Sequence, residues 1–152
     1  MAELQTERGY REPTMTQFSV FLENRVGQLK TFLQLFEKSD IHVAAFSIVD
    51  SIDCAIVRCL LAPADEAREL LRSKGIANSE VDVVVAELPS ADALAQLCEC
   101  LVKAELNIHY AYALLSHPTG RPTVALYVDE PALAASVLRK SHFNLLGEAD
   151  LK

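Results

Sequence analysis

The sequence predicts an α+β fold made of two copies of one strand–helix–strand–strand–helix–strand unit. Residues 16–88 carry alternating apolar runs and helix-spaced apolar stripes in that order. The following residues repeat the order at an offset of 65, where Leu94, Leu97, Cys98 and Leu101 match Leu29, Phe32, Leu33 and Phe36. This split arrangement is ferredoxin-like, so we expect antiparallel sheets with the helices on one face.

Each element of the first unit has a local signal. Strands are expected at Thr16–Glu23, Val43–Val49, Cys54–Leu61 and Glu80–Leu88, where apolar and β-branched residues dominate. The stripe over 29–36 predicts the first helix. The second helix is expected to begin at Pro63 and to end at Gly75, because proline suits a first turn and glycine a helix end.

The second unit follows with less regular signals. Strands are expected at His109–Ser116, Thr123–Val128 and Phe143–Leu151, and a helix is expected to begin at Pro131. Between Gly75 and Ala91 the chain must hold the last strand of one unit and the first strand of the next. Two short strands and one long shared strand both satisfy this stretch, with Pro89 at its exit. The predicted organisation is a tail at 1–15 and two modules at 16–82 and 83–152.

The central strands are apolar on both faces. In the strand from Cys54 to Leu61, Ile56 and Leu60 lie on the face opposite Val57 and Leu61. A sheet covered by helices on one side only would show polar residues on its open face. We therefore expect a second copy of the chain to cover that face, which gives a homodimer.

Composition excludes several classes of function. The net charge is −7 and the basic residues are scattered singly, which disfavours nucleic acid and anionic membranes as partners. There is no apolar stretch of the roughly 20 residues that a membrane-spanning helix needs. The first 15 residues lack the apolar core of a signal peptide, so a cytoplasmic location is expected.

No catalytic or metal-binding pattern is present. The cysteines and histidines lack metal-ligand spacing, so we expect no metal, no cofactor and no disulfide; they are Cys54, Cys59, Cys98, Cys100, His42, His109, His117 and His142. No nucleophile has an evident base beside it in the sequence. The expected function is therefore not enzymatic.

The segment from Leu22 to Leu29 joins a strand to the beginning of a helix and is the most informative one chemically. Backbone N–H groups at such a junction can hold a carboxylate, Gly27 permits close approach, and Asn24 can cap the turn or bind a ligand. A plain helix cap without any ligand explains the same residues.

Residues 22–29, 40–43 and 46–50 resemble an ACT domain, whose first motif is roughly L-x-N-R-P-G-x-L. The resemblance covers residues 16–152 as two copies, and it implies that an amino acid binds between modules or subunits. By that resemblance the ligand carboxylate would meet Asn24, Arg25, Val26, Gly27, Gln28 and Leu29, and its amino group would meet Ser47 and Asp50. Both residues also have a purely structural explanation, in which Asp50 favours a turn and Ser47 is a small residue of the sheet.

Two departures from the family motif bear on this site. Val26 stands where the family has proline, which loosens the loop without removing a polar group. The matching stretch of the second module, 88–94, lacks both the asparagine and the glycine, so that site is expected to be degenerate. Tyr110 and Tyr112 are expected either to form a wall of the first site or to pack in the core.

The leading hypothesis is a non-catalytic, homodimeric amino-acid sensor. A second hypothesis is a regulatory subunit of a separate enzyme, because the first module is also similar to the regulatory subunit of acetolactate synthase. A third hypothesis is a small enzyme that uses Asp50, Cys54 or a histidine. A fourth is a structural dimer whose ligand site is lost.

Overall fold

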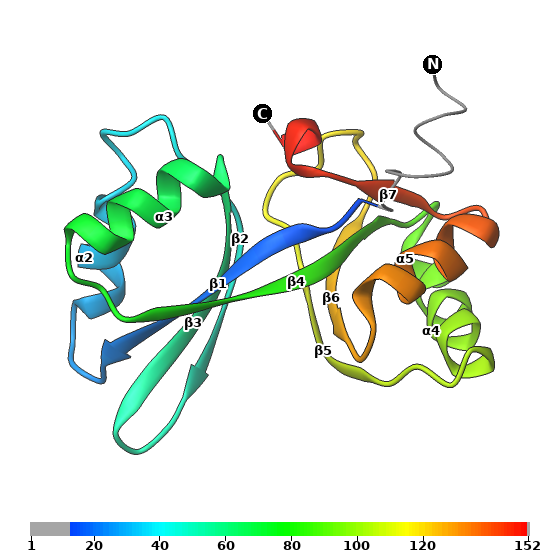
Figure 1. The fold of residues 1–152 in the computed structure, drawn as a ribbon, viewed down its shortest axis with the longest axis horizontal. Coiled ribbons are helices and arrows are strands. Elements are labelled where there is room, and N and C mark those ends of the chain that lie inside the picture. The colour runs from blue at the N-terminus through cyan, green and yellow to red at the C-terminus, as the bar shows by residue number, and fades with distance from the viewer. Residues whose placement is uncertain (1–12, 152) are drawn as a thin grey trace.

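The computed structural model describes residues 13–151, which form seven strands and four α-helices (Figure 1). The first module contains β1 (Met15–Glu23), α2 (Gln28–Gln34), β2 (His42–Asp50), β3 (Cys54–Ala62), α3 (Ala64–Ser73) and the first half of β4 (Asn78–Glu87). The second module continues with α4 (Leu94–Lys103), β5 (Ile108–Ala113), β6 (Thr123–Val128), α5 (Pro131–Lys140), β7 (Asn144–Leu146) and two 3-10 turns, η1 (Ala91–Ala93) and η2 (Glu148–Leu151). Residues 1–12 of the expected tail lie outside the described part, and Met15 already belongs to β1.

Strand β4 belongs to both modules. Its residues Asn78–Val83 pair with β1, whereas Val84–Glu87 pair with β6, and the last three also pair with β7. Of the two arrangements that the sequence left open, the structure therefore has the single shared strand, and the expected boundary between residues 82 and 83 falls inside it.

The strand order identifies each module as ferredoxin-like. The sheets of the two modules join through β4 in the order β2-β3-β1-β4-β6-β5, with β7 paired to β4, and all pairs are antiparallel. Each half of β4 thus completes a β-α-β-β-α-β unit. Figure 1 shows α2 and α3 on one outer side and α4 and α5 on the other, with the strands between them. The predicted α+β fold class is confirmed.

Element ends differ from the sequence prediction where local hydrogen bonds redirect the chain. The first helix ends at Gln34 because Phe36 N–H donates to the Leu33 carbonyl, three residues back, at 3.2 Å. β5 ends at Ala113, and the Leu115 N–H then donates to the Ala44 carbonyl of the first module at 2.8 Å.

The closing strand is also shorter than predicted. β7 ends at Leu146 because the Asp150 carboxylate accepts the N–H of Gly147 at 2.8 Å and turns the chain into η2.

Three apolar clusters hold these layers together. One lies under α2 and α3 and includes Phe18, Phe32 and Leu71. A second lies under α4 and α5 and includes Leu101 and Leu138. The third lies between the two sheets and is made of Met15, Ala44, Ala45, Leu60, Ala62, Val83, Val85, Leu114, Ala125, Leu146 and Leu151.

The third cluster covers much of the helix-free sheet faces within one chain. Leu60, which was expected to require a second copy, is fully buried against residues of the second module. The remainder of the first module's open face is still exposed, as at Phe21 and Val49. The apolar character of both faces therefore has an intramolecular cause, and a second copy stays a proposal for the exposed remainder. No helix within residues 13–151 has the length and apolarity to cross a lipid bilayer.

Candidate functional site

The loop between β1 and α2 is shaped by Gly27. Its φ of 87° lies in the left-handed region, which a residue with a side chain adopts only with strain. The Gln28 N–H donates to the Arg25 carbonyl at 3.3 Å, which closes the turn. A Cβ built on Gly27 would meet no atom within 4 Å, so the space beside this backbone is open. No side chain caps the helix at this end.

Asn24 and Asp50 meet at the edge of this loop. The Asn24 Nδ2 atom donates to the Asp50 carboxylate at 2.9 Å and lies 3.5 Å from the Ser51 carbonyl. β3 separates β1 from β2 in the sheet, so the contact joins the ends of two strands rather than neighbouring strands. Both side chains are exposed. The pair presents a carboxylate and an amide to solvent at the end of the loop that contains Gly27.

The other predicted residues are distributed around this point. Arg25 is exposed and forms an ion pair with Glu23 at 2.5 Å. Val26 is fully exposed, and Gln28 and Leu29 are half-buried at the beginning of α2. Ser47 lies apart from them, because its register partner is Arg58 on the face that turns toward the second module. The structure thus brings Asn24 and Asp50 together but not Ser47.

Apolar side chains surround the loop at this end of the first module. Exposed large apolar residues there are Phe21, Val26, Ile48, Val49 and Ile52, of which Val26 and Ile52 are 107% and 96% exposed. β2 is also an edge strand of the sheet, with unpaired backbone groups along one side. This end therefore carries five of the nine exposed large apolar residues in the described part of the chain.

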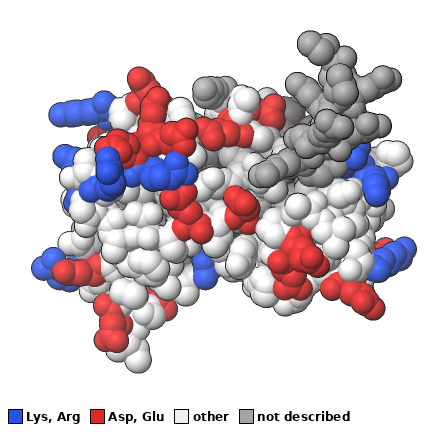
Figure 2. Space-filling view, viewed as in Figure 1, with Lys and Arg blue, Asp and Glu red and all other residues white. Residues whose placement is uncertain are grey.

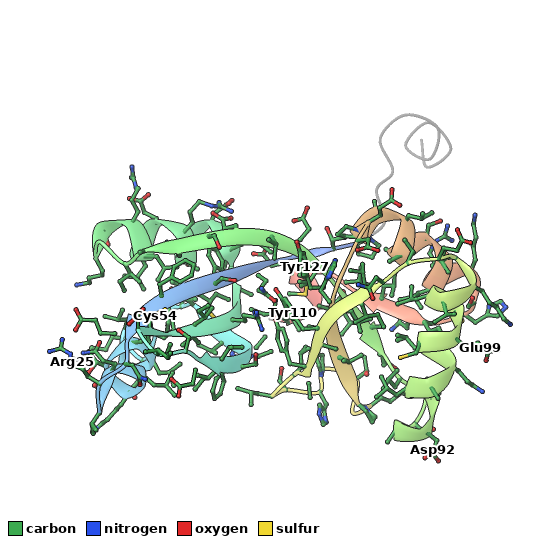
Figure 3. All side chains as sticks on the ribbon, turned by 90° about the horizontal axis from the view of Figure 1, so that it is seen from below. Arg25, Cys54, Asp92, Glu99, Tyr110 and Tyr127 are labelled. Atoms are coloured by element: carbon green, nitrogen blue, oxygen red, sulfur yellow. The ribbon has the colours of Figure 1, made fainter. Side chains whose placement is uncertain are left out.

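Tyr110 and Tyr112 lie between the modules, away from the loop. Figure 3 shows Tyr110 in the middle of the molecule and Arg25 at its far end. The Gln17 amide donates to the Tyr110 hydroxyl at 2.6 Å and accepts from the Tyr112 hydroxyl at 2.7 Å. Burial raises the pKa of the Tyr112 phenol above its ordinary value. The Arg58 guanidinium carbon lies 3.8 Å from the centre of the Tyr110 ring.

The corresponding loop of the second module borders a pocket of about 350 Å³. Leu88, Ala91 and Leu94 contribute to its wall, and Val124 and Tyr112 line it from the strands. Its walls offer little for a zwitterion, because the asparagine and glycine of the first loop have no counterpart there. That the second loop is a degenerate site stays a prediction.

Sequence reasoning missed a cavity of about 640 Å³ at the junction of the modules. Its walls come from the loop before β2, the β3–α3 connection, the β5–β6 loop and η2. No local motif announces it, since its residues lie up to about a hundred positions apart. Among residues 13–151 no three His, Cys, Asp or Glu side chains come together in a way that could hold a metal ion.

Two ferredoxin-like modules that share one strand define this chain as a paired domain. It belongs to the family of ACT domain pairs, whose model matches residues 13–152. ACT domains are regulatory domains, and the resemblance seen in the sequence is confirmed.

Solved structures share this fold. Protein BT0572 from Bacteroides thetaiotaomicron is 26% identical, covers 91% of this chain and 95% of its own, and has a TM-score of 0.81. The ligand-free regulatory subunit of aspartate kinase from Thermus thermophilus is 14% identical, covers 86% of this chain and 91% of its own, and has a TM-score of 0.58. The structure of aspartokinase alpha and beta subunits is 16% identical, covers 88% of this chain and 99% of its own, and has a TM-score of 0.53. No curated protein sequence matches this chain.

Proposed function

We propose that the protein is a non-catalytic regulatory protein that binds a free amino acid at the loop between β1 and α2. The observation that supports this most directly is the contact between Asn24 and Asp50 in the loop whose turn Gly27 makes possible. An α-amino acid carries an ammonium and a carboxylate on one carbon. The Asp50 carboxylate, which the Asn24 amide holds in place, complements the ammonium, and the loop N–H groups complement the carboxylate.

A second copy of the chain completes this site in the proposal. The loop is exposed in one chain, whereas small-molecule sites enclose most of their ligand. The exposed apolar residues Ile48 and Val49 lie on the edge strand β2, where a partner would bury them and satisfy the free backbone groups. Side-chain selectivity would then come from the partner's contribution to the walls.

A thermal-shift screen against the common amino acids tests the ligand. At a concentration about a hundredfold above Kd, one amino acid is expected to raise Tm by about 5–10 °C. The rise should be lost in Asn24→Ala and in Asp50→Ala. Ser90→Ala, in the second loop and without a capping hydrogen bond, is the matched control and should keep the rise.

Two results would contradict the ligand proposal: no amino acid raises Tm, or the rise survives in both first-loop variants.

Sedimentation velocity over a range of protein concentrations tests the partner copy. The chain is expected to form a dimer that Ile48→Glu dissociates, because the substitution places a charge on the exposed edge strand. A wild-type protein that stays monomeric with and without its amino acid would remove the second copy from the proposal.

A further inference from the structure

The helix-free face of the first sheet carries one row of polar side chains. Ser19 and Ser47 are the register partners of Arg58 on the two strands beside β3, and Ser79 is the register partner of Ser19 on β4. Directly paired residues of neighbouring strands point to the same face of a sheet, so these four side chains lie in line. Ser19, Ser47 and Arg58 are half-buried, so the row is in contact with solvent.

Arg58 is a cation without a counter-charge. Four other arginines form ion pairs with carboxylates: Arg25, Arg68, Arg72 and Arg121. Arg58 forms neither an ion pair nor a hydrogen bond with any residue of the described part of the chain. Its guanidinium lies over the Tyr110 ring, a contact that needs no acceptor and leaves its N–H donors available. Such an arginine is an exception in a protein of net charge −7, on which Figure 2 shows acidic side chains gathered along the upper side.

The amide of Gln17 orients two hydroxyl groups as donors. Its Nε2 atom donates to Ser19 Oγ at 3.3 Å and to Tyr110 Oη at 2.6 Å. Each hydroxyl thus already accepts a hydrogen bond, and its own hydrogen meets no acceptor among residues 13–151. The Gln17 oxygen accepts from Tyr112, and the whole side chain is completely buried. The two donors are therefore held in place from inside the protein.

The charge and the two donors lie beside one another. Both hydroxyls contact the same Gln17 nitrogen, Ser19 is in register with Arg58, and the Tyr110 ring lies beneath the guanidinium. A guanidinium fork and hydroxyl donors without acceptors are complementary to an oxyanion. One guanidinium balances the single charge of a carboxylate, whereas a phosphate ester carries about −1.5 to −2 at neutral pH. The row therefore matches a carboxylate.

An apolar surface adjoins the polar row. Phe21 and Ile56 are in register with each other, two residues along β1 and β3 from Ser19 and Arg58, and Phe21 is 43% exposed. Two residues of a strand span about 6.6 Å, a distance that an acid with an apolar body of a few carbon atoms bridges. The polar row and this apolar pair contain no Asp or Glu, so an ammonium group would find no counter-charge in them.

We propose that the polar row binds the carboxylate of a small organic acid that has an apolar body and no ammonium group. Arg58 supplies the positive charge, Ser19 and Tyr110 donate to the carboxylate oxygens, and the body lies over Phe21 and Ile56. The ligand contacts both modules, because Tyr110 belongs to β5 of the second. This site is separate from the loop at Asn24, and Figure 3 shows Tyr110 in the middle of the molecule, away from Arg25 of that loop.

Isothermal titration of the full chain with hydrocinnamate, which is phenylalanine without its ammonium group, tests this proposal. Wild type is expected to bind it, and Arg58→Gln should weaken binding by at least about tenfold. Arg72→Gln removes the same charge from an exposed position on α3 and is the matched control, which should bind as wild type does. The neutral amide of the same acid should bind at least about tenfold more weakly.

Tyr110→Phe keeps the ring beneath Arg58 and removes only the hydroxyl donor, so it tests the site even if Arg58→Gln does not fold. It should weaken hydrocinnamate binding by about tenfold. Three results would overturn the proposal: no binding at about 10 mM hydrocinnamate, equal binding of the acid and its amide, or equal losses in Arg58→Gln and Arg72→Gln.

The variant Asn24→Ala distinguishes this site from the loop. It should bind hydrocinnamate as wild type does, so failure of the loop proposal and failure of this one give different results. Phenylalanine titrated into the same variant should bind at least about tenfold more weakly than hydrocinnamate, because its ammonium group has no counter-charge in the polar row. Equal binding of the two would contradict the stated class of ligand.

Discussion

Gln17 offers the sharpest test of how the two modules are held together. Its side chain is completely buried on the inner face of β1, and its amide oxygen accepts the hydrogen bond that Tyr112 donates at 2.7 Å. Tyr112→Phe keeps the ring and removes only the hydroxyl. The amide oxygen is then left buried without that donor, so the free energy of unfolding should fall by about 1–3 kcal/mol.

The matched substitution on the other side is Gln17→Met, which keeps the length of the side chain and removes the amide. Each tyrosine then loses one neutral hydrogen bond, and neither is a fully buried residue, so we expect a smaller loss of about 1 kcal/mol. The combination Gln17→Met/Tyr112→Phe leaves no amide oxygen to satisfy. It should cost less than the sum of the two single variants by about 1 kcal/mol.

Urea denaturation at equilibrium gives the required free energies, with the m-value as a check that the same surface unfolds in each variant. Tyr110→Phe belongs in the same series, because it keeps the ring beneath the Arg58 guanidinium and removes only the acceptor of the 2.6 Å hydrogen bond. If Tyr112→Phe and Gln17→Met each unfold within about 0.3 kcal/mol of wild type, or if their effects simply add, the amide does not link the modules.

Two further predictions concern ionisable groups. Burial raises the pKa of the Cys59 thiol to about 12. In the folded protein at pH 8, iodoacetamide should therefore modify the half-exposed Cys54 and spare Cys59. Mass spectrometry of the peptides measures both modifications. Hydrogen bonds from the Arg68 guanidinium lower the pKa of Glu80, so this carboxylate stabilises the fold at neutral pH, and the stabilisation is lost as pH falls through its folded pKa. Glu80→Gln should therefore lower Tm at pH 7, and the difference from wild type should shrink as the pH falls below the pKa of Glu80 in the folded protein; a constant difference across the range would contradict the assignment.

Local patterns predicted the elements well because they act over a few residues. The strand Thr123–Val128 and the beginning of a helix at Pro131 are found as predicted, since alternation and proline geometry are properties of the segment itself. The shared strand β4 was one of two open alternatives, because both arrangements have the same alternation. Only pairing with β1 on one half and β6 on the other decides between them.

The functional surfaces were less predictable because they depend on distant contacts. The partner of Gln17 lies 93 residues away, and nothing in a Gln within an alternating strand specifies it. Ser47 was grouped with Asp50 from the sequence, yet the register of β2 on β3 turns it toward Arg58. The junction cavity is assembled from separate segments of both modules, so no window of the sequence contains it.

The continuous strand β4 explains why the sheets face one another. Strands twist with a fixed hand, so one strand that leaves the first sheet and enters the second rotates the second module relative to the first. The helix-free faces are thereby turned together and bury Leu60, Leu114 and their neighbours. The modules cannot separate without exposing that cluster, so we expect any relative motion of the modules to take the form of a change in the twist of β4. The junction cavity takes its walls from both modules, which would make its shape sensitive to that twist.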